Sequence, residues 1–233
     1  MNLKDAKVLV TGGSTGIGYD TAKLLKSEGA DVAICGRNKD RLHKAAAELD
    51  VLGIHADVSD EDQVRAMVKQ VINNFGDYNV LVNNAAYGYF SPLTDIDTKA
   101  FSQQLATNIT GAMLAAKYSA KHFIEKSYGN IINISSTAGG KGFAGGTPYV
   151  ASKFALGGMT QSWAYELRKH NIRVMQINPS EVLTQFAANA GYDQKMSDRK
   201  LQGIDIAHAV KSVLTMEDRG FVTDLTVWAT NPE

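Results

Sequence analysis

The sequence predicts an α/β fold: a doubly wound parallel sheet of seven strands with helices on both faces. Seven short apolar runs are rich in β-branched residues, and most are bounded by Gly, Asn or Asp. Stretches with helical spacing lie between them, and strands that alternate with helices form right-handed crossovers. No Pro/Gly/Ser-rich linker or charge run divides the 233 residues, so residues 1–233 are expected to form a single domain.

The individual elements follow from these runs. The expected strands are KVLVT (7–11), DVAIC (31–35), VLGIHA (51–56), NVLVNNA (79–85), GNIINIS (129–135), IRVMQIN (172–178) and FVTDLTVWA (221–229). Helical spacing predicts helices over 19–28, 61–75, 99–125, 151–169 and 205–214. Ligands of such a sheet bind at the carboxyl ends of the strands, so the residues just after each strand are the candidates for function.

Charge, hydropathy and cysteine content argue against several kinds of partner. Basic and acidic residues number 24 each, so no net field favours nucleic acid or an anionic membrane. No apolar span reaches 18 residues and the opening MNLKDAKVLV has no apolar signal region, so we expect a cytoplasmic protein. The single Cys35 cannot form an internal disulfide, and the five scattered histidines predict no metal site. The expected partner is a small molecule.

A glycine-rich stretch, TGGSTGIG (11–18), follows the first expected strand. Glycines leave the backbone free to turn tightly and to approach a pyrophosphate, and the next helix offers unpaired N–H groups to that anion. The stretch departs from GxGxxG by one extra residue, and glycines also occur in ordinary tight turns. Its place between a strand and a helix favours nucleotide binding. The candidate contacts are Gly12, Ser14, Thr15, Gly16, Ile17 and Gly18.

The ends of the second and third strands indicate which cofactor binds. Arg37 stands where an acid would accept hydrogen bonds from the ribose hydroxyls of NAD(H). Its guanidinium suits a 2′-phosphate by charge and geometry, so NADP(H) is predicted in preference and NAD(H) stays possible. The alternative is that Arg37 is a solvated loop residue. Asp57 could accept a hydrogen bond from the adenine amino group, or it could cap the turn before SDEDQV.

Candidate catalytic residues follow the fifth strand and begin the next helix. Thr147 and Pro148 are typical of the N-cap and N1 positions, which places Tyr149 in the first helical turn. Lys153 lies four residues later on the same helix face, about 5–6 Å away between Cβ atoms. A Tyr/Lys pair at this spacing also arises by chance on solvated faces. Its coincidence with the Ser136 hydroxyl and the glycine-rich stretch at one sheet edge favours chemistry.

The proposed chemistry requires a tuned phenol. At its ordinary pKa of about 10 a tyrosine transfers protons poorly at neutral pH, and lowering that pKa by about three units requires about 4 kcal/mol. A helix N-terminus supplies about 0.3–1 kcal/mol. We therefore predict that Lys153, with the positive ring of an oxidised nicotinamide, lowers the pKa of Tyr149. Tyr149 would be the general acid in carbonyl reduction, or the base in the reverse reaction, with Ser136 binding the carbonyl oxygen.

Several motifs run in one order along almost the whole chain. They are TGGSTGIG (11–18), ADV (56–58), NNAA (83–86), Asn108 in TNITG, SS (135–136), YVASK (149–153) and NPSEVLT (178–184). In these motifs and nearly in their spacing, the chain resembles the compact, single-domain short-chain dehydrogenases/reductases. Within that family it is similar to 3-oxoacyl-carrier-protein reductase-like and sepiapterin reductase-like members.

The resemblance implies a Rossmann-type sheet and the catalytic set Ser136, Tyr149, Lys153 and Asn108. Lys153 would also hold the nicotinamide ribose, and Asn108 would bend its helix and bind a water that relays protons to Lys153. The resemblance further implies cofactor contacts from the backbone of Asn83 and Ala85, from Asp57 and Val58 at the adenine, and from Pro179, Val182 and Thr184 at the nicotinamide.

The chain departs from the family pattern at four places. Ala86 and Ser180 replace the usual glycines of NNAG and NPG, and Thr15 stands where many NADPH-using members have a second basic residue. Because Ser180 is less free than glycine to adopt a positive φ, the nicotinamide end of the site is affected most. The end LTVWATNPE lacks the glycine-rich tail of many tetramers. The family nevertheless implies a homodimer or homotetramer through the helices at 99–125 and 148–169.

The expected substrate is a small carbonyl compound or alcohol in a partly apolar pocket. Residues 185–203 are expected to form a substrate flap, and the aromatic candidates for the pocket are Tyr87, Tyr89, Phe90, Phe143, Phe186 and Tyr192. We expect an NADPH-dependent reductase of a ketone or aldehyde, such as a 3-oxoacyl thioester or a sugar. The alternatives are an NAD-dependent alcohol dehydrogenase and, in another class, a non-catalytic nucleotide-sensing protein.

Overall fold

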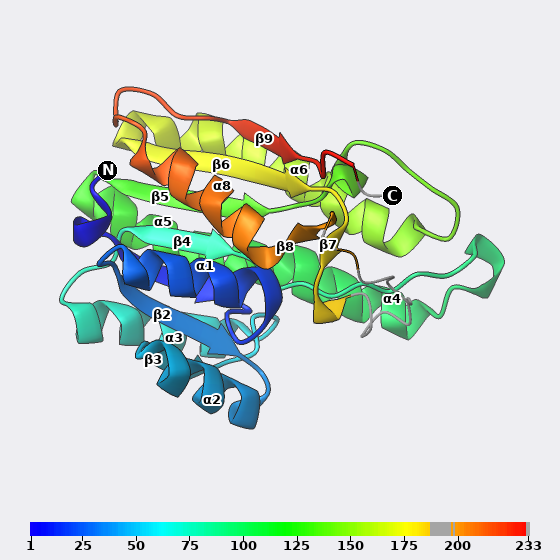
Figure 1. The fold of residues 1–233 in the computed structure, drawn as a ribbon, viewed down its shortest axis with the longest axis horizontal. Coiled ribbons are helices and arrows are strands. Elements are labelled where there is room, and N and C mark those ends of the chain that lie inside the picture. The colour runs from blue at the N-terminus through cyan, green and yellow to red at the C-terminus, as the bar shows by residue number, and fades with distance from the viewer. Residues whose placement is uncertain (187–196, 198, 232–233) are drawn as a thin grey trace.

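Seven strands form one parallel sheet in the order β3-β2-β1-β4-β5-β6-β9. Figure 1 labels β3, β2, β4, β5, β6 and β9 in this order across the sheet. The computed structural model describes residues 1–186, 197 and 199–231. The strand order reverses between β1 and β4, where the chain passes from one half of the sheet to the other, and this is the doubly wound arrangement. The predicted fold class is confirmed.

The elements follow the predicted order, with an added helix after β2 and an added two-stranded pair after β6. They are β1 (Lys7–Thr11), α1 (Gly16–Ser27), β2 (Asp31–Gly36), α2 (Lys39–Leu49), β3 (Leu52–His55), α3 (Glu61–Phe75), β4 (Val80–Asn83), α4 (Thr98–Leu105), a π-helical turn (Ala106–Gly111), α5 (Ala112–Lys126), β5 (Gly129–Ile134), α6 (Thr147–Leu167), β6 (Ile172–Pro179), β7 (Val182–Leu183), β8 (Leu201–Gln202), α8 (Gly203–Thr215) and β9 (Asp224–Val227).

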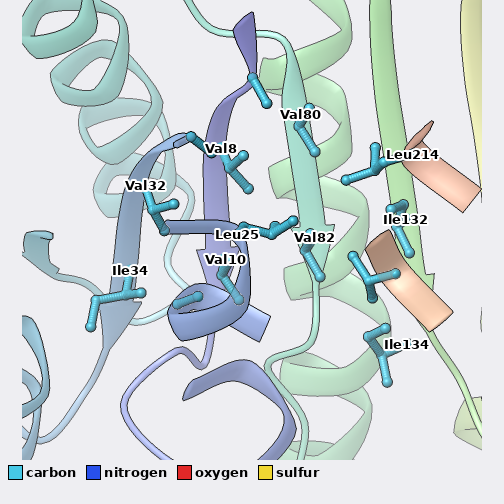
Figure 2. Close-up of a cluster of buried hydrophobic side chains, with 14 of the residues drawn as sticks. Val8, Val10, Leu25, Val32, Ile34, Val80, Val82, Ile132, Ile134 and Leu214 are labelled. Carbon is cyan, nitrogen blue, oxygen red and sulfur yellow. The ribbon is translucent and has the colours of Figure 1, made fainter. Parts of the chain in front are cut away.

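Alternation along the strands gives the sheet two apolar faces. In β1, Val8 and Val10 point to the face covered by α1, α2 and α8, where they belong to one apolar cluster with Leu25 and Leu214 (Figure 2). Leu9 points to the other face, which α3, α5 and α6 cover. Because successive side chains of a strand point to opposite faces, one apolar run supplies both cores. Both faces of the sheet are therefore buried, as the continuous apolar strands predict.

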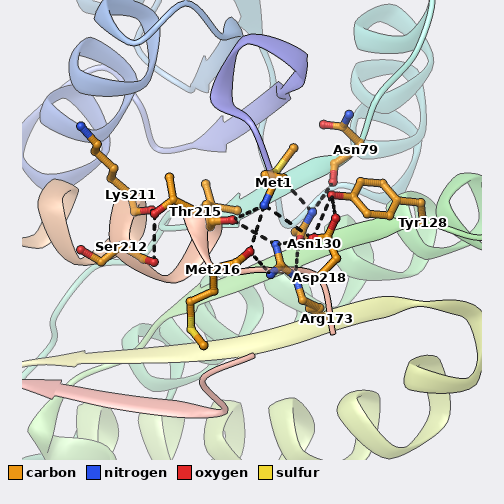
Figure 3. A network of polar contacts seen from close by, with 11 residues as sticks. Met1, Asn79, Tyr128, Asn130, Arg173, Lys211, Ser212, Thr215, Met216 and Asp218 are labelled. Carbon is orange, nitrogen blue, oxygen red and sulfur yellow. Dashed lines mark hydrogen bonds and ion pairs between the residues drawn. The ribbon is translucent and has the colours of Figure 1, made fainter. Parts of the chain in front are cut away.

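A polar network closes the amino-terminal end of the sheet (Figure 3). Arg173 of β6 is 5% exposed and donates to Oδ1 of Asn130 at 2.7 Å. Its other nitrogens donate to the backbone oxygens of Leu214 and Met216 at 3.1 and 3.2 Å, and Asp218 lies 3.4 Å away. This network ties β5 and β6 to the end of α8.

Two helices differ in detail from the predictions. The helix expected over 99–125 is interrupted by the π-helical turn Ala106–Gly111, which contains Asn108. The helix α6 begins at Thr147 with Gly146 as its N-cap, so the prediction of Thr147 as N-cap is wrong by one residue. Tyr149 nevertheless lies in its first turn. No helix among the described residues is long and apolar enough to cross a membrane.

Candidate active site

A cleft of about 1250 Å³ opens at the carboxyl ends of the strands. It runs from the loop after β1, past the ends of β4 and β5, to the segment after β6. Fourteen of the predicted site residues line it: Gly12, Ser14, Thr15, Gly16, Ile17, Arg37, Val58, Ala85, Ser136, Tyr149, Lys153, Pro179, Val182 and Thr184. The other four, Gly18, Asp57, Asn83 and Asn108, lie behind or beside that lining.

The glycine-rich loop has the shape that a pyrophosphate requires. Gly12 and Gly16 have φ angles of 65° and 56°, which only glycine adopts at little cost. A Cβ at Gly12 would lie 2.9 Å from the Cα of Ala85, so a side chain there would press against the loop after β4. Thr15, the N-cap of α1, makes no side-chain cap bond, which leaves the first N–H groups of the helix available to an anion.

Two predicted cofactor residues, Gly18 and Asn83, do not line the cleft. A Cβ at Gly18 would collide with the backbone oxygen of Gly12 and with Nδ2 of Asn84, so Gly18 permits close packing. The Asn83 side chain points into the protein and donates to the oxygens of Ala112 and Asn133. Its neighbour Asn84, which the sequence reasoning missed, lines the cleft and donates to the oxygens of Thr11 and Gly12.

The residues predicted to bind the adenosine lie side by side. A guanidinium nitrogen of Arg37 is 3.7 Å from Oδ2 of Asp57, and both side chains are partly exposed. The other oxygen of Asp57 accepts from the N–H and hydroxyl of Ser59, which is the local turn considered as the alternative. Arg41 also lines this end of the cleft and was not predicted. In the sequence, a second arginine four residues after Arg37 could have indicated this residue as a candidate.

Three predicted catalytic side chains meet where β5 ends and α6 begins. The Ser136 side chain lies near enough to the Tyr149 phenol to lower its pKa, and both side chains line the cleft. The ammonium of Lys153 lies 5.7 Å from the centre of the Tyr149 ring and donates to the backbone oxygen of Ile134 at 2.9 Å. Because Lys153 is one helical turn behind Tyr149, α6 holds both groups at the same wall of the cleft.

Burial dominates the electrostatics of this site. Burial raises the pKa of the Tyr149 phenol to about 12, and the nearby Ser136 hydroxyl opposes that rise. Burial also lowers the pKa of the Lys153 ammonium to about 8. The polypeptide by itself therefore does not lower the pKa of Tyr149, because desolvation outweighs an ammonium more than 5 Å from the ring. The prediction includes the ring of an oxidised nicotinamide and stays a prediction. Further stabilisation of the phenolate has to come from the bound cofactor.

Asn108 lies behind Tyr149 at the π-helical turn. Its side-chain amide donates to the backbone oxygen of Tyr87 and to the hydroxyl of Ser152, at 3.0 and 3.1 Å. Its carbonyl oxygen accepts from the N–H of Tyr87 at 3.0 Å. π-Helical turns are frequent at functional sites because they shift the backbone register within a helix. The π-helical turn interrupts the helix at Asn108, while the predicted bend and water relay stay predictions.

Comparison with known proteins identifies the family. The family model described as short chain dehydrogenase matches residues 6–195, which is most of the chain. The chain belongs to the short-chain dehydrogenases. As a member of this family, the protein is an NAD(P)-dependent oxidoreductase. An uncharacterized oxidoreductase of Staphylococcus aureus strain MRSA252 is 33% identical over 228 residues, 97% of either chain.

Two solved structures closely resemble this chain. An alcohol dehydrogenase from the archaeon Thermococcus sibiricus, complexed with 5-hydroxy-NADP, has a TM-score of 0.88 and 27% identity, and covers 97% of this chain and 98% of its own. A variant of actinorhodin polyketide ketoreductase with NADPH has a TM-score of 0.89 and 27% identity, and 98% of each chain is covered.

The departures of this short-chain dehydrogenase at Ala86 and Ser180 fit its backbone. Neither residue has a positive φ, since the described non-glycine residues with positive φ are Asp50, Ser127 and Asn171. The replacement of the usual glycine by Ser180 therefore causes no backbone strain. Ala86 and Ser180 both line the cleft.

The substrate end of the cleft contains part of the predicted aromatic set. Tyr87, Phe90, Phe143 and Phe186 line the cleft. Tyr89 does not, because its hydroxyl accepts from the N–H of Asp97 at the start of α4. Most of the flap predicted over 185–203, with Tyr192, lies outside the described residues. Among those that the structure describes, no group of three or more His, Cys, Asp or Glu side chains could hold a metal ion.

Proposed function

We propose that this short-chain dehydrogenase is an NADPH-dependent reductase that transfers a hydride to a ketone or aldehyde, a reaction that also runs in reverse on a secondary alcohol. The observation that carries the proposal is the meeting of Ser136, Tyr149 and Lys153 at one wall of a cleft whose other end is the glycine-rich loop. A nucleotide-sensing protein would need the loop but not the three catalytic groups.

Each of the three catalytic residues has a separate role in the proposed reaction. Ser136 donates a hydrogen bond to the carbonyl oxygen as negative charge develops on it. Tyr149 gives its phenolic proton to that oxygen, so the product is an alcohol. The ammonium of Lys153 stabilises the resulting phenolate and returns a proton from solvent. When bound, the reduced nicotinamide supplies the hydride, with its two electrons, to the carbonyl carbon and becomes oxidised.

A preference for NADPH over NADH is supported by the ribose end of the cleft. Arg37 and Arg41 both line it, and two guanidinium groups suit a 2′-phosphate better than two ribose hydroxyls. The ligands of the two similar structures are NADP compounds. The ion pair between Arg37 and Asp57 favours the second candidate, an NAD-dependent alcohol dehydrogenase, because Arg37 already has a carboxylate partner.

The remaining expectations are part of the same proposal. We propose one catalytic domain over residues 1–233 with a substrate flap at 185–203, in a cytoplasmic homodimer or homotetramer. The β7–β8 pair, which joins Val182 to Leu201 and Leu183 to Gln202, supports the flap because it draws together the two ends of that segment. A salt bridge of 2.8 Å between Lys200 and Glu181 adds a second connection there.

The first experiment is a titration with NADPH and, separately, with NADH, followed by quenching of tryptophan fluorescence. Trp228 lines the cleft and Trp163 packs against the second core, so a Trp228→Phe variant assigns the signal. Tighter binding of NADPH, followed by NADPH oxidation with a panel of ketones and aldehydes, supports the proposal. Saturable binding without turnover of any carbonyl or alcohol would instead indicate a nucleotide sensor.

A further inference from the structure

Beside Tyr149, aromatic rings form an apolar wall at the substrate end of the cleft. The ring centres of Phe90 and Phe186 lie 5.3 and 5.5 Å from that of Tyr149, and Phe143 lies 6.1 Å from Phe90. These rings come from three separate segments: the loop after β4, the loop before α6, and the segment after β7. Tertiary folding therefore gathers them around the one ring that carries the reactive hydroxyl.

Glycines keep this wall closely packed. A Cβ at Gly88 would lie 2.7 Å from the Phe90 ring and 2.9 Å from the Phe186 ring. A Cβ at Gly146 would likewise lie 2.7 Å from the Phe143 ring. Any side chain at these two positions would push the rings away, so the loops present the phenyl rings at close range to Tyr149.

Resting on the proposed function, we propose that the substrate is an uncharged ketone whose carbonyl is attached to, or part of, a flat aromatic or alicyclic ring, and that Phe90 and Phe186 select it. Ring pairs with centres 4.5–7 Å apart interact favourably beyond their buried area. A substrate ring entering next to Tyr149 would complete such pairs and place its carbonyl at the phenol and at Ser136.

The same wall disfavours other carbonyl substrates. A sugar would bring several hydroxyl groups against phenyl faces that offer no hydrogen bonds, and each unpartnered group costs free energy. An anionic substrate would need a cation. Arg37 and Arg41 lie at the ribose end of the cleft, and the buried ammonium of Lys153 already donates to the backbone oxygen of Ile134. Lys141, two residues before Phe143, also lines the cleft, but its side chain is exposed and therefore solvated.

The test compares kcat/KM for matched carbonyl compounds with saturating NADPH. Acetophenone and cyclohexanone represent ring ketones, acetone the small ketone, benzoylformate the anionic ring ketone, and glyceraldehyde the hydroxylated aldehyde. We expect kcat/KM for the ring ketones to exceed that for acetone by at least about 100-fold. In Phe90→Ala and Phe186→Ala this ratio should fall by about 10-fold, chiefly through a higher KM.

Control variants separate ring contact from a disturbed loop. Tyr89→Ala truncates the neighbouring ring on the same loop outside the cleft and should leave the ratio unchanged. Phe90→Leu keeps an apolar side chain without the ring and should give an intermediate ratio. NADPH affinity, measured for every variant, reports whether the cofactor end is still folded.

Each outcome bears on a different claim. Equal kcat/KM for acetone and the ring ketones, or a ratio that Phe90→Leu, Phe90→Ala and Phe186→Ala all leave unchanged, would overturn the inference while keeping the reductase. A preference for benzoylformate that disappears in Lys141→Gln would show an anionic substrate and also overturn it. Failure of every carbonyl, with NADPH bound, would remove the proposed function itself.

Discussion

Two buried cations stand at opposite ends of the sheet, and their surroundings differ. Arg173, at the amino-terminal end, donates to a side-chain oxygen and to two backbone oxygens, and it faces the carboxylate of Asp218. Lys153, at the carboxyl end, is 3% exposed and donates to the backbone oxygen of Ile134. Burial lowers the pKa of Lys153 to about 8.

The difference shows how one sheet separates stability from function. The guanidinium at the amino end has several fixed acceptors, so its charge contributes to a packed structure. At the carboxyl end, two further side-chain atoms of the cleft, Oγ of Ser135 and Oε1 of Gln176, are buried without a hydrogen-bond partner among the described residues. Buried polar groups in such a state are costly and are typical of sites completed by a ligand.

The largest expected effect is on catalysis at the carboxyl end. Tyr149→Phe removes the proton donor and should lower kcat by about 100- to 10,000-fold. NADPH affinity should change by no more than a few-fold, because the ring is kept. The measurement is NADPH oxidation with a ketone that the wild type reduces, with Tyr165→Phe on the exposed part of α6 as control. Unchanged kcat in Tyr149→Phe would assign proton transfer to another group.

The second prediction concerns only the network around Arg173 at the amino-terminal end of the sheet. Arg173→Met leaves the buried Asn130 Oδ1 without its donor, while the Leu214 and Met216 oxygens keep the Met1 ammonium as donor. The substitution should lower the free energy of unfolding by about 1–3 kcal/mol. Denaturant unfolding measures this change. As a control, Lys211→Met breaks a partly exposed salt bridge to Glu28 and should cost at most about 1 kcal/mol. Similar losses in both variants would mean that burial of Arg173 is not what matters.

The third prediction uses the pKa of Lys153. Because its folded pKa of about 8 lies below the unfolded value of about 10.5, the unfolded chain binds more protons between these pH values. The wild type should therefore gain up to about 3 kcal/mol of stability relative to Lys153→Met as pH rises from 7 to 10. Thermal unfolding of both proteins across this range measures the gain, and the exposed Lys141→Met should show none. A difference that stays constant with pH would mean that Lys153 is not perturbed in the folded state.

The smallest effect is expected at the ribose end of the cleft. Arg37→Asp places a carboxylate where a 2′-phosphate would bind and should shift the NADPH to NADH affinity ratio by about 10-fold toward NADH. Paired fluorescence titrations measure the ratio, and Arg41→Gln should move it in the same direction by less. An unchanged ratio in both variants would show that the phosphate is recognised elsewhere, and it would favour the NAD-dependent candidate.

The sequence by itself determined the fold class, the glycine-rich loop and the Tyr149/Lys153 pair. These features depend on short-range rules, since alternation defines a strand, positive φ angles need glycine, and residues four apart share a helix face. The same rules located Ser136 at the end of β5. The motif order, which carried the family resemblance, added Asn108, a residue that local patterns treat as an ordinary polar helix position.

Only the tertiary structure decided which neighbours these residues acquire. It turned Asn83 inward and Asn84 toward the loop, and it gathered Phe90 and Phe186 around Tyr149. It also decided the pKa of Tyr149, because desolvation depends on everything packed around the phenol and not on the lysine one turn away. Contacts between loops that are distant in sequence follow from chain topology, which no local pattern encodes.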